Sequence, residues 1–172
     1  MVTIFLDIDG VLATDREYMR NSKKFKESHE WARKLNVPYP FNPQCVEIFN
    51  EILSATDCQI VLSSDWRISW TLEELDTIFK ENGVKQSPVN TTEKALYFHE
   101  GNYNKKRAGE IEFYIQENGI EDWIILDDLN VYSYFPDGKR DGIFKTEDQE
   151  GLKKTKLKEK IIRRLQKYDT EK

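Results

Sequence analysis

The stretch "TIFLDIDGVLATD", residues 3–15, decides how the rest of the chain is interpreted. Its first residues predict a short buried strand over 2–8 that carries two aspartates, Asp7 and Asp9, at its end. Residues two apart on a strand point to the same side, so both carboxylates can converge on one point while Ile8 faces the core. Two neighbouring anions repel each other unless a cation or a shared proton compensates them. The stretch therefore predicts a functional site at the end of a core strand.

Two further apolar stretches, "CQIVLSS" at 58–64 and "DWIILDD" at 122–128, predict strands with polar ends. The polar ends are Ser63 with Ser64 and Asp127 with Asp128. Helical patterns separate the strands, and this alternation predicts a three-layer α/β/α sandwich, Rossmann-like, with a central parallel sheet. Ligands of such sheets bind beyond the carboxyl ends of the strands, so we expect the polar ends to lie close together.

Cap signals and apolar spacing define the expected helices. One helix is expected to begin at Pro43, after the cap residue Asn42. A second is expected to begin at Leu72, after a capping box of Thr71 and Glu74. Two more are expected over 105–118 and 151–168. Residues 15–41 do not fit the alternation and predict a small cap or flap insert. Residues 84–104 are expected to hold one short strand. The expected organisation is a single domain over 1–172, with the insert at about 15–41 and a basic C-terminal helix at about 151–168.

Composition limits the class of protein. Of the 172 residues, 38% are hydrophobic and 33% are charged, which is typical of a folded domain. No apolar run approaches the roughly 18 residues of a membrane helix, and the chain enters its first strand without a leader, so we expect a cytoplasmic protein without a membrane partner. Cys45 and Cys58 match no zinc spacing and are expected to be buried thiols.

The net charge of −5 is unevenly distributed. Residues 151–172 hold nine basic and three acidic residues, whereas the remainder is strongly acidic. Such a basic end is either the solvated face of a helix or a contact for a polyanion.

The polar strand ends suit a phosphate substrate and a hard cation. Oxygen-only ligands from two separate strands favour Mg²⁺, which is the usual cation with phosphate groups. Serine hydroxyls can donate to phosphoryl oxygens, and three basic residues lie near the start of the helix expected over 105–118. They are Lys105, Lys106 and Arg107.

Four motifs in this order resemble those of the haloacid dehalogenase superfamily: "DIDGV", "IVLSS", "NKKRAGEI" and "IILDD". "SSDWR" followed by "LDD" is also similar to the domain of this type in Swiss-army-knife RNA repair proteins and their stand-alone relatives. The resemblance covers residues 2 to about 130. It implies a Mg²⁺-dependent phosphatase that cleaves a phosphomonoester through an aspartyl phosphate, with a small cap on the sandwich.

The resemblance also implies roles for single residues. Asp7 matches the nucleophile, and Asp9 matches the general acid that then acts as a base. The phosphate-binding hydroxyl matches Ser64, which stands two residues before Trp66, with Ser63 as a close alternative.

The basic residue of the third motif matches Lys106 best, and Arg107 is the next candidate. Asp127 and Asp128 match the acidic pair that holds the metal together with Asp7 and Asp9, and either member of the pair can be the direct ligand. Trp66 is either a substrate contact or a packed side chain. Arg67 is either a substrate contact or part of a surface ion pair.

The substrate expected from these features is a nucleotide or the end of a nucleic acid. One alternative is a small-metabolite phosphatase acting on sugar phosphates. The other is a non-catalytic nucleic-acid-binding or adaptor module that uses the basic C-terminal helix. The expected partners are thus a phosphorylated small molecule or a nucleic-acid end, and no protein partner is indicated.

Overall fold

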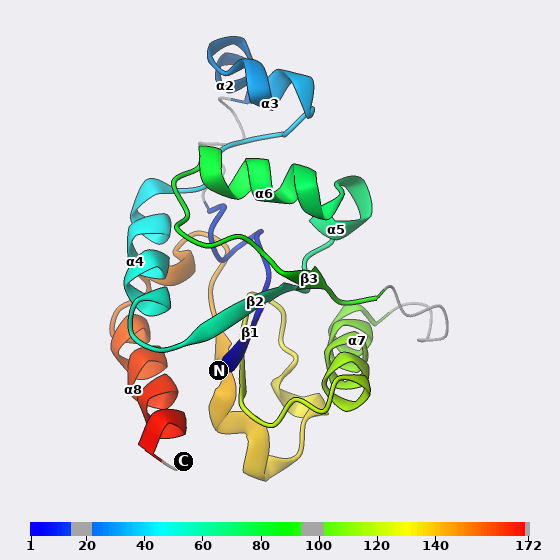
Figure 1. Ribbon diagram of the computed structural model, residues 1–172, viewed down its shortest axis with the longest axis vertical. Coiled ribbons are helices and arrows are strands. Elements are labelled where there is room, and N and C mark those ends of the chain that lie inside the picture. The colour runs from blue at the N-terminus through cyan, green and yellow to red at the C-terminus, as the bar shows by residue number, and fades with distance from the viewer. Residues whose placement is uncertain (15–21, 94–101, 171–172) are drawn as a thin grey trace.

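The protein contains one five-stranded sheet. The computed structural model describes residues 1–14, 22–93 and 102–170 (Figure 1). The strands are β1 (Val2–Leu6), β2 (Cys58–Leu62), β3 (Asn90–Thr91), β4 (Trp123–Asp127) and β5 (Ile143–Lys145). All are parallel, in the order β3–β2–β1–β4–β5. This arrangement confirms the predicted α/β fold with a central parallel sheet, and β3 is the short strand expected within 84–104.

Helices connect the strands. The α-helices are α2 (Ser22–Ser28), α3 (Glu30–Lys34), α4 (Pro43–Leu53), α5 (Trp66–Ser69), α6 (Leu72–Glu81), α7 (Tyr103–Glu117) and α8 (Leu157–Thr170). Three short 3₁₀ helices follow β4 and β5: η1 (Tyr132–Tyr134), η2 (Asp137–Gly142) and η3 (Gly151–Lys153). The predicted caps are confirmed, because the Asn42 side chain accepts from the backbone N–H of Gln44 and Thr71 forms a capping box with Glu74.

Both faces of the sheet are covered. Every residue of β1 and β4 is buried, as expected for parallel strands between two helical layers. Leu6 faces the layer that includes α4 and α8, whereas Phe5 faces α7 and η1. Figure 1 shows α4 and α8 on one side of the sheet and α7 on the other. Cys45 and Cys58 are free and buried, as predicted.

The central strands end earlier than the apolar pattern predicts. β1 stops at Leu6, because the chain turns at Gly10, where φ is +71°, and three backbone N–H groups then point back to the carbonyl of Ile8. β2 and β4 end at Leu62 and Asp127. The polar residues of all three strand ends therefore lie in or next to the turns that follow the strands.

The C-terminal part differs from the sequence expectation. α8 begins at Leu157 instead of 151, because Gly151 and Lys156 have positive φ values of 54° and 62° that no α-helix contains. β5 is a strand that no sequence pattern predicts, since it has only three residues and follows the 3₁₀ helix η2.

The expected insert at 15–41 begins with residues 15–21, which lie outside the described residues. The rest contains α2 and α3, which lie beyond α6 at one end of the molecule (Figure 1). The Trp70 indole N–H donates to the Leu35 carbonyl at 2.9 Å, so α3 is joined to the segment after α5. Among the described residues, no helix has the length and apolar character needed to cross a membrane.

Candidate active site

Three polar side chains lie in one row across the sheet. Asp7, Ser63 and Asp127 each stand two residues after a residue that faces α7, namely Phe5, Val61 and Ile125. Strand pairing brings the three side by side. Leu6 is in register with both Leu62 and Leu126, and Asp7, Ser63 and Asp127 each follow one residue later. Their side chains therefore point toward the α7 layer.

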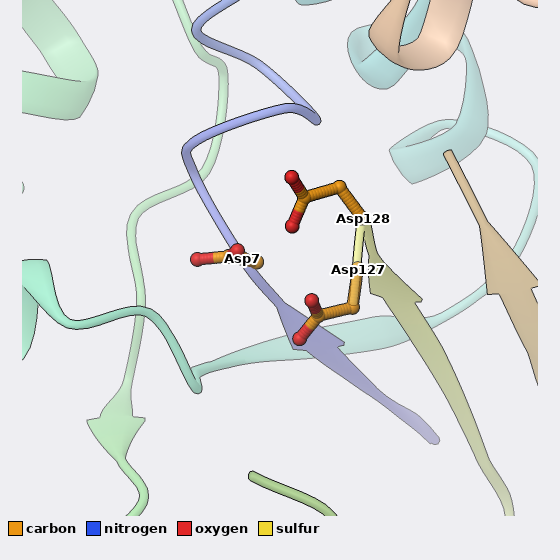
Figure 2. A group of neighbouring side chains, drawn as sticks. All are labelled: Asp7, Asp127 and Asp128. Atoms are coloured by element: carbon orange, nitrogen blue, oxygen red, sulfur yellow. The ribbon is translucent and has the colours of Figure 1, made fainter. Parts of the chain in front are cut away.

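Asp7, Asp127 and Asp128 form an acidic group. Each offers a carboxylate oxygen that lies within 4.8 Å of the others, and Figure 2 shows the three side chains converging from the ends of β1 and β4. Asp7 and Asp127 are buried, and Asp128 is half-buried. Asp9, which the resemblance places with the metal ligands, does not belong to this group.

Gly10 makes the acidic group compact. Its φ of +71° suits glycine, and a Cβ there would lie 2.6 Å from Oδ2 of Asp128. The loop after β1 can therefore approach the end of β4 only with glycine at this position. Thr146, which follows β5, donates from its hydroxyl to the Gly10 carbonyl at 2.6 Å and holds the loop in place.

Arg107 is the basic residue that reaches the acidic group. Its Nη1 lies 2.8 Å from Oδ2 of Asp127 and 3.5 Å from Oδ1 of Asp7, and its Nη2 lies 3.6 Å from Asp65. Lys106, the residue that the sequence favours for the third motif, is half-exposed, and Lys105 is exposed. The structure thus points to Arg107, because its position on α7 turns its side chain toward the sheet.

The charges of the group explain its pKa shifts. Burial, then the charge of Asp7, raises the pKa of Asp128 to about 6. Burial and Asp7 also raise the pKa of Asp127, although Arg107 opposes this shift. Burial would lower the pKa of Arg107, but the surrounding carboxylates outweigh it and raise the value, so the guanidinium stays charged. If all three carboxylates were ionised, the group would carry an excess of two negative charges beside the guanidinium, which a divalent cation with oxygen ligands would compensate.

Asp9 is held apart from the acidic group by two aromatic residues. The Tyr39 hydroxyl donates to its Oδ1, and the Trp66 indole N–H donates to its Oδ2 at 3.0 Å. Burial raises the pKa of Asp9, as does the charge of Asp7, while the hydrogen bonds from Tyr39 and Trp66 lower it, and the net shift is upward. The protonated form of Asp9 is therefore favoured more than that of an ordinary exposed carboxyl group.

The two serines after β2 point to different surroundings. Both are fully buried. Oγ of Ser63 lies in the row with Asp7 and has no hydrogen-bond partner among the described residues, whereas Oγ of Ser64 accepts from the backbone N–H of Trp66 at 3.4 Å. The sequence favours Ser64 as the phosphate contact, but the register and the unpaired hydroxyl favour Ser63.

Trp66 and Arg67 point inward. Trp66 is 4% exposed and contacts Asp9. The guanidinium of Arg67 donates to the carbonyls of Ser63 and Ser64, both at 2.7 Å, and to Glu110 at 2.6 Å. Arg67 thus makes an ion pair that is buried rather than on the surface, and it supports the backbone of the two serines.

The sequence motifs assign no role to three residues of this region, namely Tyr39, Glu110 and Thr146. Glu110 stands three residues after Arg107, so the helical spacing was a usable signal for it. Tyr39 and Thr146 contact Asp9 and Gly10 across 30 and 136 residues of chain. No local motif marks such distant partners.

The parallel sheet and the acidic group at its edge fit the haloacid dehalogenase superfamily. A family model for the "HAD domain in Swiss Army Knife RNA repair proteins" matches residues 3–157, and this family supports a hydrolase of that type. The match covers most of the chain, and the protein belongs to this family, which confirms the resemblance found in its motifs. Searches of curated proteins and of solved structures found no match.

Proposed function

We propose that the protein is a Mg²⁺-dependent phosphohydrolase that cleaves a phosphomonoester through an aspartyl phosphate on Asp7. The observation that carries this proposal is the row of Asp7, Ser63 and Asp127 beneath Arg107. It combines a carboxylate nucleophile, a free hydroxyl donor and a fixed cation at one sheet edge. Such an arrangement suits phosphoryl transfer, in which positioning and charge stabilisation do most of the catalysis.

Asp7 is oriented for attack by its own contacts. Within the described residues, its Oδ1 accepts the backbone N–H of Ile8 at 2.9 Å and lies next to Arg107. These contacts leave Oδ2 to attack phosphorus. Asp7, Asp127 and Asp128 would hold the Mg²⁺, which neutralises charge on the phosphoryl oxygens when bound.

The proposed reaction has two steps. Oδ2 of Asp7 forms a bond to phosphorus as the ester P–O bond breaks, and the leaving oxygen takes a proton from Asp9. Asp9 then accepts a proton from water, which attacks the aspartyl phosphate, breaks the bond to Asp7 and releases inorganic phosphate. Ser63 and Arg107 donate to the phosphoryl oxygens in both steps.

We further propose a nucleotide or nucleic-acid end as the substrate. The matching family is described as a domain of RNA repair proteins. A second support is Tyr103, which is 69% exposed and stands one helical turn before Arg107 on the same face of α7. An aromatic ring at this place can stack on a base whose phosphate lies at Arg107.

Phosphate release from a panel of phosphomonoesters tests the proposal. The panel contains sugar phosphates, mononucleotides, and RNA and DNA with 5′ or 3′ phosphates, each with MgCl₂ or with EDTA. We expect turnover that requires Mg²⁺, is abolished by Asp7→Asn and is fastest on a nucleotide or nucleic-acid end. Asp57→Asn, at the opposite end of β2, is the matched control and should retain full activity.

The other outcomes separate the alternatives. Faster turnover of sugar phosphates would identify a small-metabolite phosphatase. If the folded protein binds RNA but releases phosphate from no substrate, the hydrolase proposal fails and an adaptor module explains the chain better.

A further inference from the structure

The geometry around Asp9 points to a positioning pair, and we propose that Tyr39 and Trp66 hold the Asp9 carboxyl group in the orientation that delivers a proton to the leaving oxygen. This inference rests on the proposed function, because it concerns the proton that Asp9 transfers there. It gives Trp66 a specific role and adds Tyr39, which lies outside the four motifs of the site.

The two donors fix the plane of the carboxyl group. The Tyr39 hydroxyl contacts Oδ1 and the Trp66 indole N–H contacts Oδ2, so neither oxygen can rotate away without losing a hydrogen bond. Each carboxyl oxygen has two lone-pair directions. One direction on each oxygen therefore stays available for the transferred proton.

The two aromatic side chains are themselves fixed. The Trp66 ring lies 4.7 Å from that of Trp70 and 5.8 Å from those of Tyr39 and Phe41, measured between ring centroids. Trp70 is tied to the Leu35 carbonyl by its indole N–H. An aromatic cluster of this kind keeps its members in place, so that Tyr39 and Trp66 can act as rigid donors.

Asp7 and Asp9 are held by different parts of the protein. Asp7 lies beside Arg107 of α7, whereas Asp9 contacts Tyr39, which lies between α3 and α4, and Trp66 at the start of α5. The segment between α3 and α4 thus contributes a donor to Asp9. Small errors in the orientation of a catalytic group can lower the rate about 100-fold.

Aryl phosphates with different leaving groups test this role. The 4-nitrophenolate group leaves without much help from an acid, whereas phenolate needs a proton, so the loss of acid positioning should affect phenyl phosphate more. The measured quantity is kcat/KM, which reports the phosphoryl transfer to Asp7. The variants are Tyr39→Phe and Trp66→Phe, which each remove one hydrogen bond and keep an aromatic ring.

We expect each variant to lower kcat/KM about 30-fold on phenyl phosphate and less than about threefold on 4-nitrophenyl phosphate. Asp9→Asn should show the same selectivity in a stronger form. Tyr114→Phe is the matched control, because it removes a tyrosine hydroxyl whose partner is Asn90, and it should change neither value.

The outcomes distinguish this inference from the proposed function. An active wild type whose Tyr39→Phe and Trp66→Phe variants lose the same factor on both substrates overturns the positioning role and leaves the phosphatase proposal intact. A folded wild type that hydrolyses neither substrate, nor any member of the wider panel, overturns both.

Discussion

Gly10 is the residue on which the spacing of the acidic group depends most directly. In Gly10→Ala the new Cβ would lie 2.6 Å from Oδ2 of Asp128, and the φ of +71° adds strain. We expect a loss of about 1 kcal/mol in stability and at least tenfold weaker Mg²⁺ binding. Thermal unfolding and calorimetric titration with MgCl₂ measure the two effects.

Gly119→Ala provides the matched control. Gly119 also has a positive φ, of 59°, but a Cβ there would meet no atom within 4 Å. The control should therefore lose less stability, from its φ value alone, and keep its Mg²⁺ affinity. Equal Mg²⁺ affinity in both variants would show that the clash with Asp128 has no effect on Mg²⁺ binding.

Asp128 makes the stability of the metal-free protein depend on pH. Its pKa of about 6 lies above the value of about 3.9 in an unfolded chain. The folded state holds this proton more tightly than the unfolded chain does. The stabilisation that comes from protonated Asp128 is therefore complete below about pH 4 and is lost as the pH rises through about 6. Asp128→Asn removes this loss.

In EDTA, we expect Asp128→Asn to unfold about 3 °C above the wild type at pH 8, and the difference to shrink at pH 5. Adding MgCl₂ at pH 8 should raise the wild-type transition temperature more than that of the variant. If the unfolding temperatures of variant and wild type differed by the same amount at pH 5 and pH 8, the raised pKa of Asp128 would be contradicted.

At the scale of elements, a buried ion pair joins α5 to α7. Arg67 and Glu110 are 3% and 2% exposed, and Arg67 also holds the carbonyls after β2. In Glu110→Gln, the arginine keeps a buried charge with a weaker partner, so we expect a loss of about 3 kcal/mol in unfolding free energy. Urea denaturation measures it.

Arg67→Met removes the charge and also leaves the carbonyls of Ser63 and Ser64 without this donor, so it should lose more stability than Glu110→Gln. If Glu110→Gln proves as stable as the wild type, the ion pair does not hold α5 and α7 together.

α8 lies on the opposite face of the sheet from the side chains of Asp7, Ser63 and Asp127. Lys158 pairs with Glu51 and Arg164 with Asp141, whereas Lys160 and Arg163 are exposed. We expect the double charge reversal Lys160→Glu with Arg163→Glu to leave kcat/KM on 4-nitrophenyl phosphate within about twofold. Phosphate release measures it, and a larger change would link the basic helix to the chemistry.

The same variant separates the two interpretations of the basic C-terminal end. A higher KM confined to RNA with a phosphorylated end, most marked at low salt, would identify α8 as a polyanion contact. An unchanged KM on RNA would identify it as a solvated face.

At the scale of the whole molecule, the sequence predicts the sheet because apolar periodicity and polar strand ends are local signals. β1, β2 and β4 were all predicted, with ends displaced by one or two residues. β5 and the start of α8 were not, because they depend on the 3₁₀ helix η2, on the positive φ values of Gly151 and Lys156, and on packing with distant segments. Such tertiary constraints leave no periodic pattern in a short element.

The same limit applies to the candidate site. Asp7, Asp127 and Asp128 stand in motifs, so the sequence predicts their convergence. The choices between Ser63 and Ser64, and between Lys106 and Arg107, depend on which face of a strand or helix each side chain occupies. A one-residue shift reverses the face on a strand, so Ser63 is favoured only once the register and its unpaired hydroxyl are known. Tyr39 required the folded chain, because nothing near Asp9 in the sequence indicates it.

The position of β1 in the centre of the sheet also matters for the order of biosynthesis. β1 is made first, yet its neighbour β4 is made more than 110 residues later, and the hydroxyl that holds Gly10 comes from Thr146. At 5–20 residues per second, a ribosome needs about 10 s to cover that distance. β1, which carries Asp7 at its end, therefore keeps at least one edge unpaired until β4 has been translated. Metal binding cannot assist these early stages, because two of the three aspartates do not yet exist.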